Sequence, residues 1–393
     1  MKIAVVLTRI PFPLMKGDKL RAYYQIKELA KQHEVYLFCL NYKDEEEKAK
    51  QELLKYCKSV HIEKLNLFSS LLRVCFSFFS FLPFQTAYYN SPKAKKYFKA
   101  FVERNNIELC YFQFVRLVPF AKKINKKKVL DFQDTLSVNM KRRADNSGLL
   151  ERVLFTIEAK RLARYESKMF EVFDALTIIT DADRKLLKSP RKEEVHIIPN
   201  GVAETYFTYP QSKEKPFDIL FSGAMSYAPN IDAAEYLIKE IMPLVWEKKP
   251  NVKIAIAGGG VPSWLEKLAN ERIIMPGWVD DMKEYYSQTK IFIAPMRIGT
   301  GLQNKLLEAM AMNVACITSP LANQALRAKD KEEILIADNA RGYAECIIEL
   351  LDNKELEKNI AKAGKDYVFN KYSWQNSCER LSNIFYELNS LSK

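Results

Sequence analysis

The chain has 393 residues, 48% of them hydrophobic and 28% charged, so it is long enough for two hydrophobic cores and has the composition of a soluble globular protein. Its net charge of +13 arises in the first half: residues 1–200 hold 38 Lys and Arg against 23 Asp and Glu, and the remainder holds 23 against 25. This asymmetry predicts a polyanionic partner for the first half, namely acidic lipid, nucleic acid or an anionic polymer. The seven cysteines form no CxxC pair, which argues against structural zinc and predicts buried free thiols in a reducing cytosol.

The first half alternates strand and helix patterns. Strands are predicted at residues 3–7, 34–40, 108–113, 129–131, 175–180 and 195–198, and helices at 19–32 and 149–170. The first apolar run is too short for a signal peptide and fits a strand. The alternation predicts a parallel sheet with helices on both faces.

One long aromatic segment, residues 67–84, leaves two interpretations open. Arg73 and four serines interrupt it, so it falls short of the apolar span of about 18 residues that a transmembrane helix requires. It is either a helix buried between layers of the domain or a surface that touches the bilayer or a lipid acceptor. In the second case, four nearby lysines would meet lipid phosphates: Lys93, Lys95, Lys96 and Lys99.

A second series of elements follows a turn at residues 200–202 and a polar linker at 209–216. Strands are predicted at 217–221, 252–257, 273–275, 291–294 and 315–318, and helices at 232–244, 282–287, from 340 onward and at 374–391. The sequence therefore predicts an α/β protein of two Rossmann-like, doubly wound domains, residues 1–208 and 209–373. The helix at residues 374–393 is expected to pack back on the first domain.

Residues 294–312 are the most informative stretch, because they combine a strand end, a glycine turn and an amphipathic helix. Backbone N–H groups and the helix dipole at such a turn attract anions. Arg297 precedes the turn and Lys305 lies one turn into the helix, so both could bind a diphosphate. The arrangement predicts a nucleotide-sugar site. As alternatives, Lys305 and Glu308 could form only a surface ion pair, and Arg297 could be only a salt-bridge partner.

The other glycine-containing turns carry weaker signals. Residues 257–263 do not complete a dinucleotide-binding fingerprint, because Ser263 stands at the third glycine position, and no P-loop sequence occurs. After the first strand, Gly17 permits close backbone approach and Asp18 could cap a helix, and we expect this loop to face a ligand. Asp181 and Asp183 fit a helix start rather than a metal-binding DxD pair.

Together these sequences resemble the retaining GT-B glycosyltransferases of family 4, also called group 1 glycosyltransferases, over nearly the whole chain. In the first half the resemblance rests on Gly17-Asp18-Lys19-Leu20-Arg21, Asp131-Phe132-Gln133-Asp134 and Pro199-Asn200-Gly201-Val202. It is most specific in the second half, at Phe221-Ser222-Gly223-Ala224-Met225, Pro229-Asn230, Gly277-Trp278-Val279 and residues 294–312. The subgroup it resembles comprises bacterial sugar transferases of exopolysaccharide gene systems.

The resemblance implies two domains that clamp a nucleotide-diphosphate sugar, with the nucleotide bound mainly by the second. Glu308 matches the second Glu of the E-x7-E motif, which binds the ribose, whereas Thr300 stands where the first Glu is expected. Contact to the donor sugar would then come from elsewhere, such as the backbone of residues 299–302. The expected donor-binding residues are Gly17, Asp18, Gly223, Asn230, Gly277, Trp278, Val279, Gly299, Thr300, Gly301, Leu302, Gln303 and Glu308.

Four residues are candidates for the chemistry. Arg297 and Lys305 would neutralise the leaving diphosphate, because fixed cations stabilise charge that grows in the transition state. Gln113 lies near the position where many relatives place a cleft residue that contacts the sugar, and Asp134, at a strand end, could face the acceptor.

We therefore expect a cytoplasmic glycosyltransferase, peripheral at the inner face of the cell membrane, that uses a UDP- or GDP-sugar and a lipid-linked or polysaccharide acceptor in surface glycan synthesis. Retention of configuration is implied by the resemblance, and neither a metal nor a tightly bound cofactor is expected. Thr300 keeps open a GT-B protein without transferase activity, either an epimerase or a silent assembly partner. A nucleic-acid-binding protein is suggested by charge alone, and the chain lacks a groove-reading motif.

Overall fold

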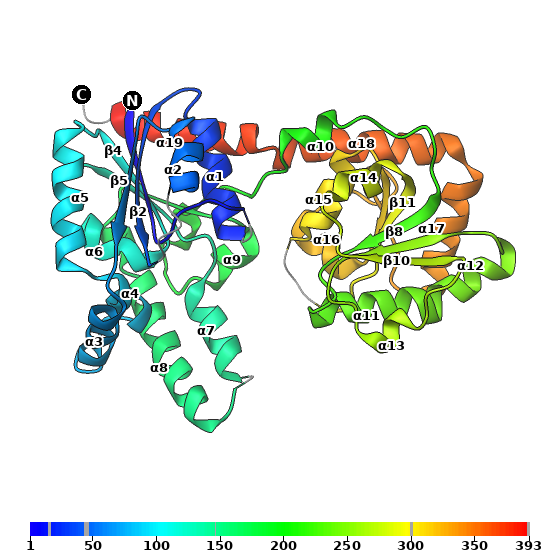
Figure 1. Cartoon of the computed structure of the whole chain (residues 1–393), viewed down its shortest axis with the longest axis horizontal. Coiled ribbons are helices and arrows are strands. Elements are labelled where there is room, and N and C mark those ends of the chain that lie inside the picture. Colours follow the sequence, from blue (N-terminus) through cyan, green and yellow to red (C-terminus); the bar gives the residue numbers. More distant parts are fainter. Residues whose placement is uncertain (15–16, 43–46, 146, 299–301, 391–393) are drawn as a thin grey trace. The chain divides into compact units, whose positions relative to one another are not determined.

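A computed structural model describes residues 1–14, 17–42, 47–145, 147–298 and 302–390. The chain divides into two compact units, one of Met1–Gly201 together with the chain from Trp374 onward, the other of Val202–Ser373. Each unit is a parallel β-sheet with helices packed on it (Figure 1). This confirms the predicted α/β fold class with two Rossmann-like domains.

The first unit is built on a seven-stranded sheet in the order β3-β2-β1-β4-β5-β6-β7, in which every neighbouring pair is parallel. The strands are β1 (Lys2–Leu7), β2 (Glu34–Asn41), β3 (Ser59–Lys64), β4 (Leu109–Gln113), β5 (Lys127–Asp131), β6 (Ala175–Ile178) and β7 (His196–Ile197). The helices are α1 (Gly17–Leu29), α2 (Glu47–Leu54), α3 (Leu67–Ser77), α4 (Phe84–Tyr89), α5 (Pro92–Arg104), α6 (Val118–Ala121), α7 (Leu136–Asp145), α8 (Leu149–Glu166) and α9 (Asp181–Leu186).

Alternation along β1 explains how this sheet acquires two cores. Val5 and Leu7 belong to the core on one face, and Ala4 and Val6 to the core on the other, because successive side chains of a strand point to opposite faces. The C-terminal helix α19 (Trp374–Ser390) joins the first of these cores, where Phe385 is fully buried. The first unit therefore contains both ends of the chain.

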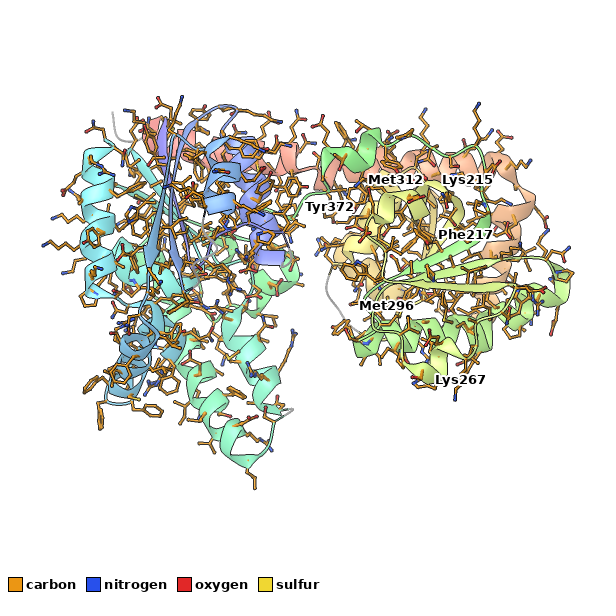
Figure 2. The ribbon with its side chains drawn as sticks, viewed as in Figure 1. Lys215, Phe217, Lys267, Met296, Met312 and Tyr372 are labelled. Atoms are coloured by element: carbon orange, nitrogen blue, oxygen red, sulfur yellow. The ribbon has the colours of Figure 1, made fainter. Side chains whose placement is uncertain are left out.

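The second unit has a six-stranded sheet in the order β10-β9-β8-β11-β12-β13, also parallel throughout. Its strands are β8 (Phe217–Ser222), β9 (Ile254–Ala257), β10 (Ile273–Gly277), β11 (Thr289–Ala294), β12 (Ala315–Thr318) and β13 (Leu335–Ile336). Its helices are α10 (Glu204–Thr208), α11 (Ala228–Tyr236), α12 (Met242–Lys248), α13 (Ser263–Glu266), α14 (Met282–Ser287), α15 (Asn304–Ala311), α16 (Pro320–Leu326), α17 (Ala340–Asp352) and α18 (Lys354–Tyr372). Met296 and Met312, labelled in Figure 2, lie in its single core.

The chain leaves the first unit at residues 201–202, earlier than the polar linker at 209–216 would place the boundary. The Val202 amide donates to the Tyr372 carbonyl at 2.6 Å, and Tyr206 and Phe207 of α10 pack against the second core. Residues 202–208 thus belong to the second unit because Val202 is buried in its core and Tyr206 and Phe207 pack against that core.

The segment at residues 67–84 is not buried between layers, so that interpretation was wrong. It forms α3, a short loop and the start of α4, and Phe79 and Phe81 are 93% and 85% exposed. Within the described residues, no helix has the length and apolarity to cross a membrane. Two cysteines also depart from the expectation of burial: Cys75 on α3 is exposed, and Cys346 is partly exposed.

Candidate functional site

The carboxyl ends of β8, β9 and β10 form a rim of glycines in the second unit. Gly258 has φ +149°, and a Cβ at this position would lie only 1.8 Å from the Gly223 carbonyl oxygen, so the two strand ends meet this closely only through glycine. The Gly258 amide donates to the Gly277 carbonyl at 2.9 Å. Two predicted site residues, Gly223 and Gly277, are thereby brought to one edge of the sheet, where parallel α/β folds bind ligands.

Trp278 and Val279 follow this rim. The Trp278 side chain is 77% exposed, and its Nε1 donates to Asp280 Oδ1 at 3.2 Å. Its ring borders the turn after β9, since a Cβ on Gly259 would lie 3.1 Å from it. Val279 packs against the core. An open aromatic face beside a glycine turn is suited to stacking a planar group.

Lys305 reaches from α15 to the end of β8. Its Nζ donates to Asn230 Oδ1 at 2.6 Å and lies 4.6 Å from the centre of the Phe221 ring. Asn230 in turn donates from Nδ2 to the Ala224 carbonyl at 2.9 Å, which keeps its oxygen toward the lysine. No carboxylate pairs with Lys305 among the described residues, and burial lowers its pKa from 10.5 to about 8.

Glu308 lies one turn further along α15 and makes a different contact. Its Oε2 accepts a hydrogen bond from the Tyr286 hydroxyl at 3.1 Å, and that hydroxyl also lies 3.1 Å from Ser222 Oγ. Burial raises the pKa of Glu308 to about 7, against the hydrogen bond from Tyr286 and the charge of Lys283, which lower it. Glu308 and Lys305 therefore do not form the surface ion pair that their spacing allows, and each keeps capacity for a ligand.

Arg297 takes the salt-bridge alternative. Its guanidinium donates to both carboxylate oxygens of Asp232, at 2.8 and 3.2 Å, and lies 3.3 Å from Glu240 Oε1. It also covers the Tyr236 ring at 4.3 Å. The charge of Arg297 is thus paired with carboxylates of α11 and of the helical turn after it.

The turn before α15 falls partly outside the described residues, which omit Gly299, Thr300 and Gly301. Leu302 packs partly against the core, and Gln303 is the N-cap of α15, without a side-chain cap hydrogen bond. The described part of the predicted turn therefore leads into the N-terminus of α15.

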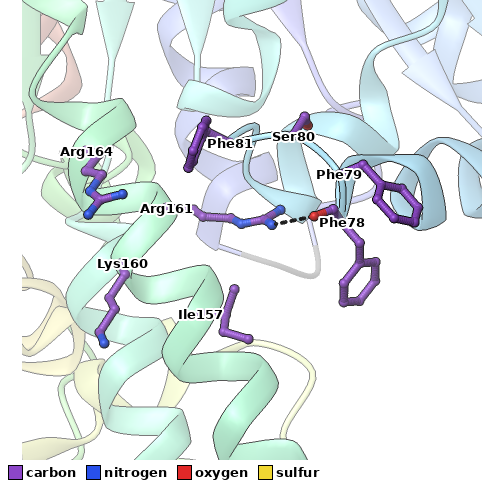
Figure 3. Close-up of a pocket in the computed structure, with 8 residues that line it drawn as sticks. All are labelled: Phe78, Phe79, Ser80, Phe81, Ile157, Lys160, Arg161 and Arg164. Carbon is purple, nitrogen blue, oxygen red and sulfur yellow. Dashed lines mark hydrogen bonds between the residues drawn. The ribbon is translucent and has the colours of Figure 1, made fainter.

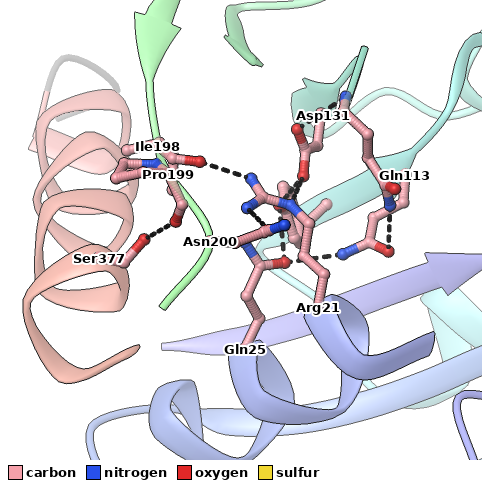
Figure 4. A network of polar contacts seen from close by, with 10 residues as sticks. Arg21, Gln25, Gln113, Asp131, Ile198, Pro199, Asn200 and Ser377 are labelled. Carbon is pink, nitrogen blue, oxygen red and sulfur yellow. Dashed lines mark hydrogen bonds and ion pairs between the residues drawn. The ribbon is translucent and has the colours of Figure 1, made fainter. Parts of the chain in front are cut away.

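The first unit buries Gln113 in a polar network beneath its strand ends (Figure 4). Gln113 donates to Gln25 Oε1 at 2.7 Å and accepts from Gln133 at 3.1 Å. Below it, Arg21 donates to Asp131 Oδ2 at 2.7 Å, and its remaining nitrogens reach Asn200 and the Ile198 carbonyl, each at 2.9 Å. Both ends of the Gln113 amide are satisfied, so the structure gives it a supporting position rather than a free one.

The other first-unit candidates lie at the same sheet edge. Gly17 and Asp18 begin α1, and Asp18 pairs with Arg9 at 3.1 Å. Asp134 follows β5, and its Oδ2 accepts from Asn139 at 2.9 Å while its Oδ1 is buried without a partner. Burial and, after it, the charge of Asp183 raise the pKa of Asp134 to about 6. This carboxyl group is thus poised to exchange a proton near neutral pH.

Known proteins resemble the chain in sequence and in fold. Residues 216–353 match the family model described as "Glycosyl transferases group 1". A Klebsiella pneumoniae protein, described as an uncharacterized 44.6 kDa protein in the cps region, is 23% identical over 98% of this chain and 99% of its own length. Residues 216–353 thus form a group 1 glycosyltransferase domain, and the chain is a glycosyltransferase.

Solved structures resemble this glycosyltransferase in fold over nearly all of the chain. Sucrose-phosphate synthase from Thermosynechococcus elongatus superposes with a TM-score of 0.67 at 13% identity, covering 100% of both chains. Anabaena HepE, solved in complex with UDP, superposes with a TM-score of 0.66 at 11% identity, covering 98% of this chain and 100% of its own. The fold is therefore GT-B. The family match contains Gly223, Asn230, Gly277, Lys305 and Glu308.

Sequence reasoning missed Tyr286 in this glycosyltransferase. Tyr286 is fully buried and orients Glu308, yet in the sequence it is one of two adjacent tyrosines on a short helix, and no spacing distinguishes it. Arg21 belongs to the sequence that carries the family resemblance, but the sequence indicated no role for it. Its pairing with Asp131 spans 110 residues, so no local signal points to it. Within the described part of the chain, no three His, Cys, Asp or Glu side chains are grouped to hold a metal ion.

Proposed function

We propose that this glycosyltransferase transfers a sugar from a UDP- or GDP-sugar to a lipid-linked glycan or polysaccharide in surface glycan synthesis, with retention of configuration and without a metal ion. One observation carries the proposal: Lys305 is a largely buried cation whose nearest polar partner is a neutral amide, one helical turn from Glu308. The cps region named for the Klebsiella relative supports the acceptor class, and the UDP complex of Anabaena HepE supports the donor class.

Lys305 would act on the leaving group. In the transfer, the bond between sugar C1 and the diphosphate oxygen breaks, and its electron pair goes to the diphosphate. The acceptor hydroxyl oxygen bonds to C1, and its proton passes to the departing diphosphate. Negative charge grows on the diphosphate as it departs, so an ammonium group beside it stabilises the transition state more than the ground state. A cation already neutralised by a carboxylate, such as Arg297, contributes less to this step.

Glu308 would hold the nucleotide. An ionised carboxylate accepts hydrogen bonds from the two ribose hydroxyls, and Tyr286 fixes its orientation by donating to Oε2. Burial raises the pKa of Glu308 to about 7, so the carboxyl group is partly protonated near neutral pH. Hydrogen bonds donated by the ligand hydroxyls would favour its charged form. The exposed Trp278 face beside the glycine rim would stack the base.

The test is a calorimetric and thermal-shift screen of the full chain against UDP, GDP, ADP, CMP and their common sugars. We expect selective stabilisation by one nucleoside diphosphate, lost in Glu308→Ala and retained in Glu345→Ala, which removes a surface carboxylate of α17. Release of the nucleoside diphosphate only when an acceptor is present identifies a transferase, whereas an epimerase needs no acceptor. Binding of none of these nucleotides would contradict the proposal.

A further inference from the structure

Helix α3 has an unusual distribution of its side chains. Its two buried residues are the small Ser70 and Ser77, whereas its large apolar side chains face outward. Phe68 and Phe76 are 71% and 72% exposed, and Leu71 is 51% exposed. A helix of a soluble domain normally turns its apolar stripe to the core, so this orientation leaves an apolar face for something outside the chain.

The loop after α3 is held in this arrangement by Arg161 of α8. Its guanidinium donates to the carbonyls of Ser77 and Leu82 at 2.8 and 3.1 Å. It also donates to the Phe78 carbonyl at 3.3 Å (Figure 3). It also lies over the Phe84 ring at 4.5 Å. Backbone carbonyls that end a helix need partners, and a charged donor supplies them here. Phe79 and Phe81 are therefore displayed by a fixed loop rather than by an unanchored one.

Helix α8 extends the apolar face and adds positive charge. Leu149, Val153, Leu154 and Ile157 are exposed, and with α3 and its loop they supply twelve of the twenty-one large apolar side chains exposed among the described residues. The loop after α3 and helix α8 line a hollow of about 350 Å³. Its lining includes the apolar Phe79, Phe81 and Ile157 and the basic Lys160 and Arg164. Lys160 and Arg164 form no ion pair or side-chain hydrogen bond within the described chain.

The surroundings of this face are basic. On α7 and α8 the exposed charged residues are Lys141, Arg142, Arg143, Arg152, Lys160 and Arg164 against Asp145 and Glu151. The only charged residue of α3 is Arg73, which bonds Ser70 and the Tyr88 carbonyl. Figure 1 shows α3, α7 and α8 projecting together from one end of the first unit's sheet. Apolar side chains at a projecting end, bordered by basic residues such as Lys160 and Arg164, match the layered chemistry of a bilayer surface.

We propose that the first unit docks on an anionic phospholipid bilayer through this surface, formed by α3, residues 78–81 and α8. The rings would enter the boundary of the acyl chains while Lys160 and Arg164 bind headgroup phosphates. A second copy of the chain fits less well, because it would bring the same cations face to face. The bilayer would be a partner of the transferase, so this docking rests on the proposed function. Vesicle binding and nucleotide binding are nevertheless measured separately.

The experiment is sedimentation of the full chain with phosphatidylcholine vesicles, with and without phosphatidylglycerol, at low and physiological salt. Binding is expected to acidic vesicles and to weaken with salt. Phe79→Ser/Phe81→Ser should bind about a hundredfold more weakly, which is tenfold, or about 1.4 kcal/mol, for each ring withdrawn from the interface. Because both rings are exposed, the variant keeps its fold. Phe369→Ser, which removes a partly exposed ring of α18, should bind like the wild type.

A charge variant separates the second contribution. Lys160→Gln/Arg164→Gln should bind acidic vesicles about thirtyfold more weakly and neutral vesicles unchanged. Lys358→Gln/Lys362→Gln, with the same i, i+4 spacing on α18, is its matched control. Equal binding by wild type and both variants, or none to acidic vesicles, overturns the inference. So does a dimer in solution that Phe79→Ser/Phe81→Ser converts to a monomer. Wild-type protein that sediments with acidic vesicles but binds none of the nucleotides would contradict the proposed function alone.

Discussion

Replacing Lys305 by methionine should stabilise the protein while it removes activity. Holding this amine charged in a buried place lowers its pKa from 10.5 to about 8, which at pH 7 costs about 3 kcal/mol of folding free energy. Methionine also loses the hydrogen bond to Asn230 and the cation–π contact with Phe221, together about 2 kcal/mol. We therefore expect a net gain of about 1 kcal/mol and a rise in Tm of about 2–4 °C.

The sign of this gain depends on pH in a definite way. The folded-state pKa of Lys305 lies below the unfolded one, so the penalty is complete below pH 8 and fades as the pH rises toward 10.5. The stability difference between Lys305→Met and wild type should therefore shrink between pH 8 and 10. Lys239→Met, which removes a surface lysine paired with Glu235, should show no such trend.

The same variant should lose transfer activity. Two unit charges about 4 Å apart interact by about 4 kcal/mol at an effective dielectric constant of 20, and loss of one donor to a developing oxyanion costs about 3–4 kcal/mol. We expect kcat/KM to fall about 100–1000-fold, measured as acceptor-dependent release of the nucleoside diphosphate. Activity within threefold of wild type, or destabilisation of Lys305→Met at pH 7 and recovery above pH 8, would refute the reasoning.

Three further outcomes follow from the described residues. Donor kcat/KM should have a bell-shaped pH profile with limbs near 7 and 8, because Glu308 must be ionised and Lys305 protonated, and a flat profile from pH 6 to 9 would contradict this. Gly258→Ala should lower Tm and abolish nucleotide binding, because its Cβ would lie 1.8 Å from the Gly223 carbonyl oxygen, and thermal-shift assays test both. Asp134→Asn should raise Tm at pH 7 but not at pH 4. The pKa of this carboxyl group is raised to about 6 in the folded state, so its ionisation destabilises the fold only above its unfolded pKa. Measuring Tm at both pH values checks this.

The sequence predicted those parts of this protein that depend on local patterns. Alternating strand and helix signals led to two parallel-sheet domains, and the i, i+3 spacing of Lys305 and Glu308 placed both on one stretch of helix. Spacing alone did not separate an ion pair from two independent contacts, because the outcome depends on Asn230, 75 residues away, and on Tyr286. The salt bridge of Arg297 could not be predicted from spacing for the same reason, since its partner Asp232 lies 65 residues away.

Hydropathy left the orientation of α3 undecided for a different reason. An apolar run indicates that exposing these side chains to water is unfavourable. Burial in a protein core and contact with a lipid interface both avoid that exposure. Two small residues, Ser70 and Ser77, decide which way the helix turns, and their role is visible only once Tyr42 and Arg73 are seen to contact Ser70. The domain boundary differs for a similar reason, because residues 202–208 can be assigned to the second unit only once Tyr206 and Phe207 are seen to pack against its core.

The partners of buried cations distinguish structural from functional positions in this chain. Arg21 has no exposed side-chain surface, yet it pairs with Asp131 and bonds two further oxygens, so its charge is fully used within the fold. Lys305 is largely buried beside two neutral partners, Asn230 Oδ1 and Met296 Sδ, an arrangement that folding alone disfavours. The charge of such a buried, unneutralised cation remains available to a ligand. The ligands that it attracts are anions. In the proposed transfer, the capacity of Lys305 to favour a departing diphosphate would follow from the lack of a carboxylate partner for it among the described residues.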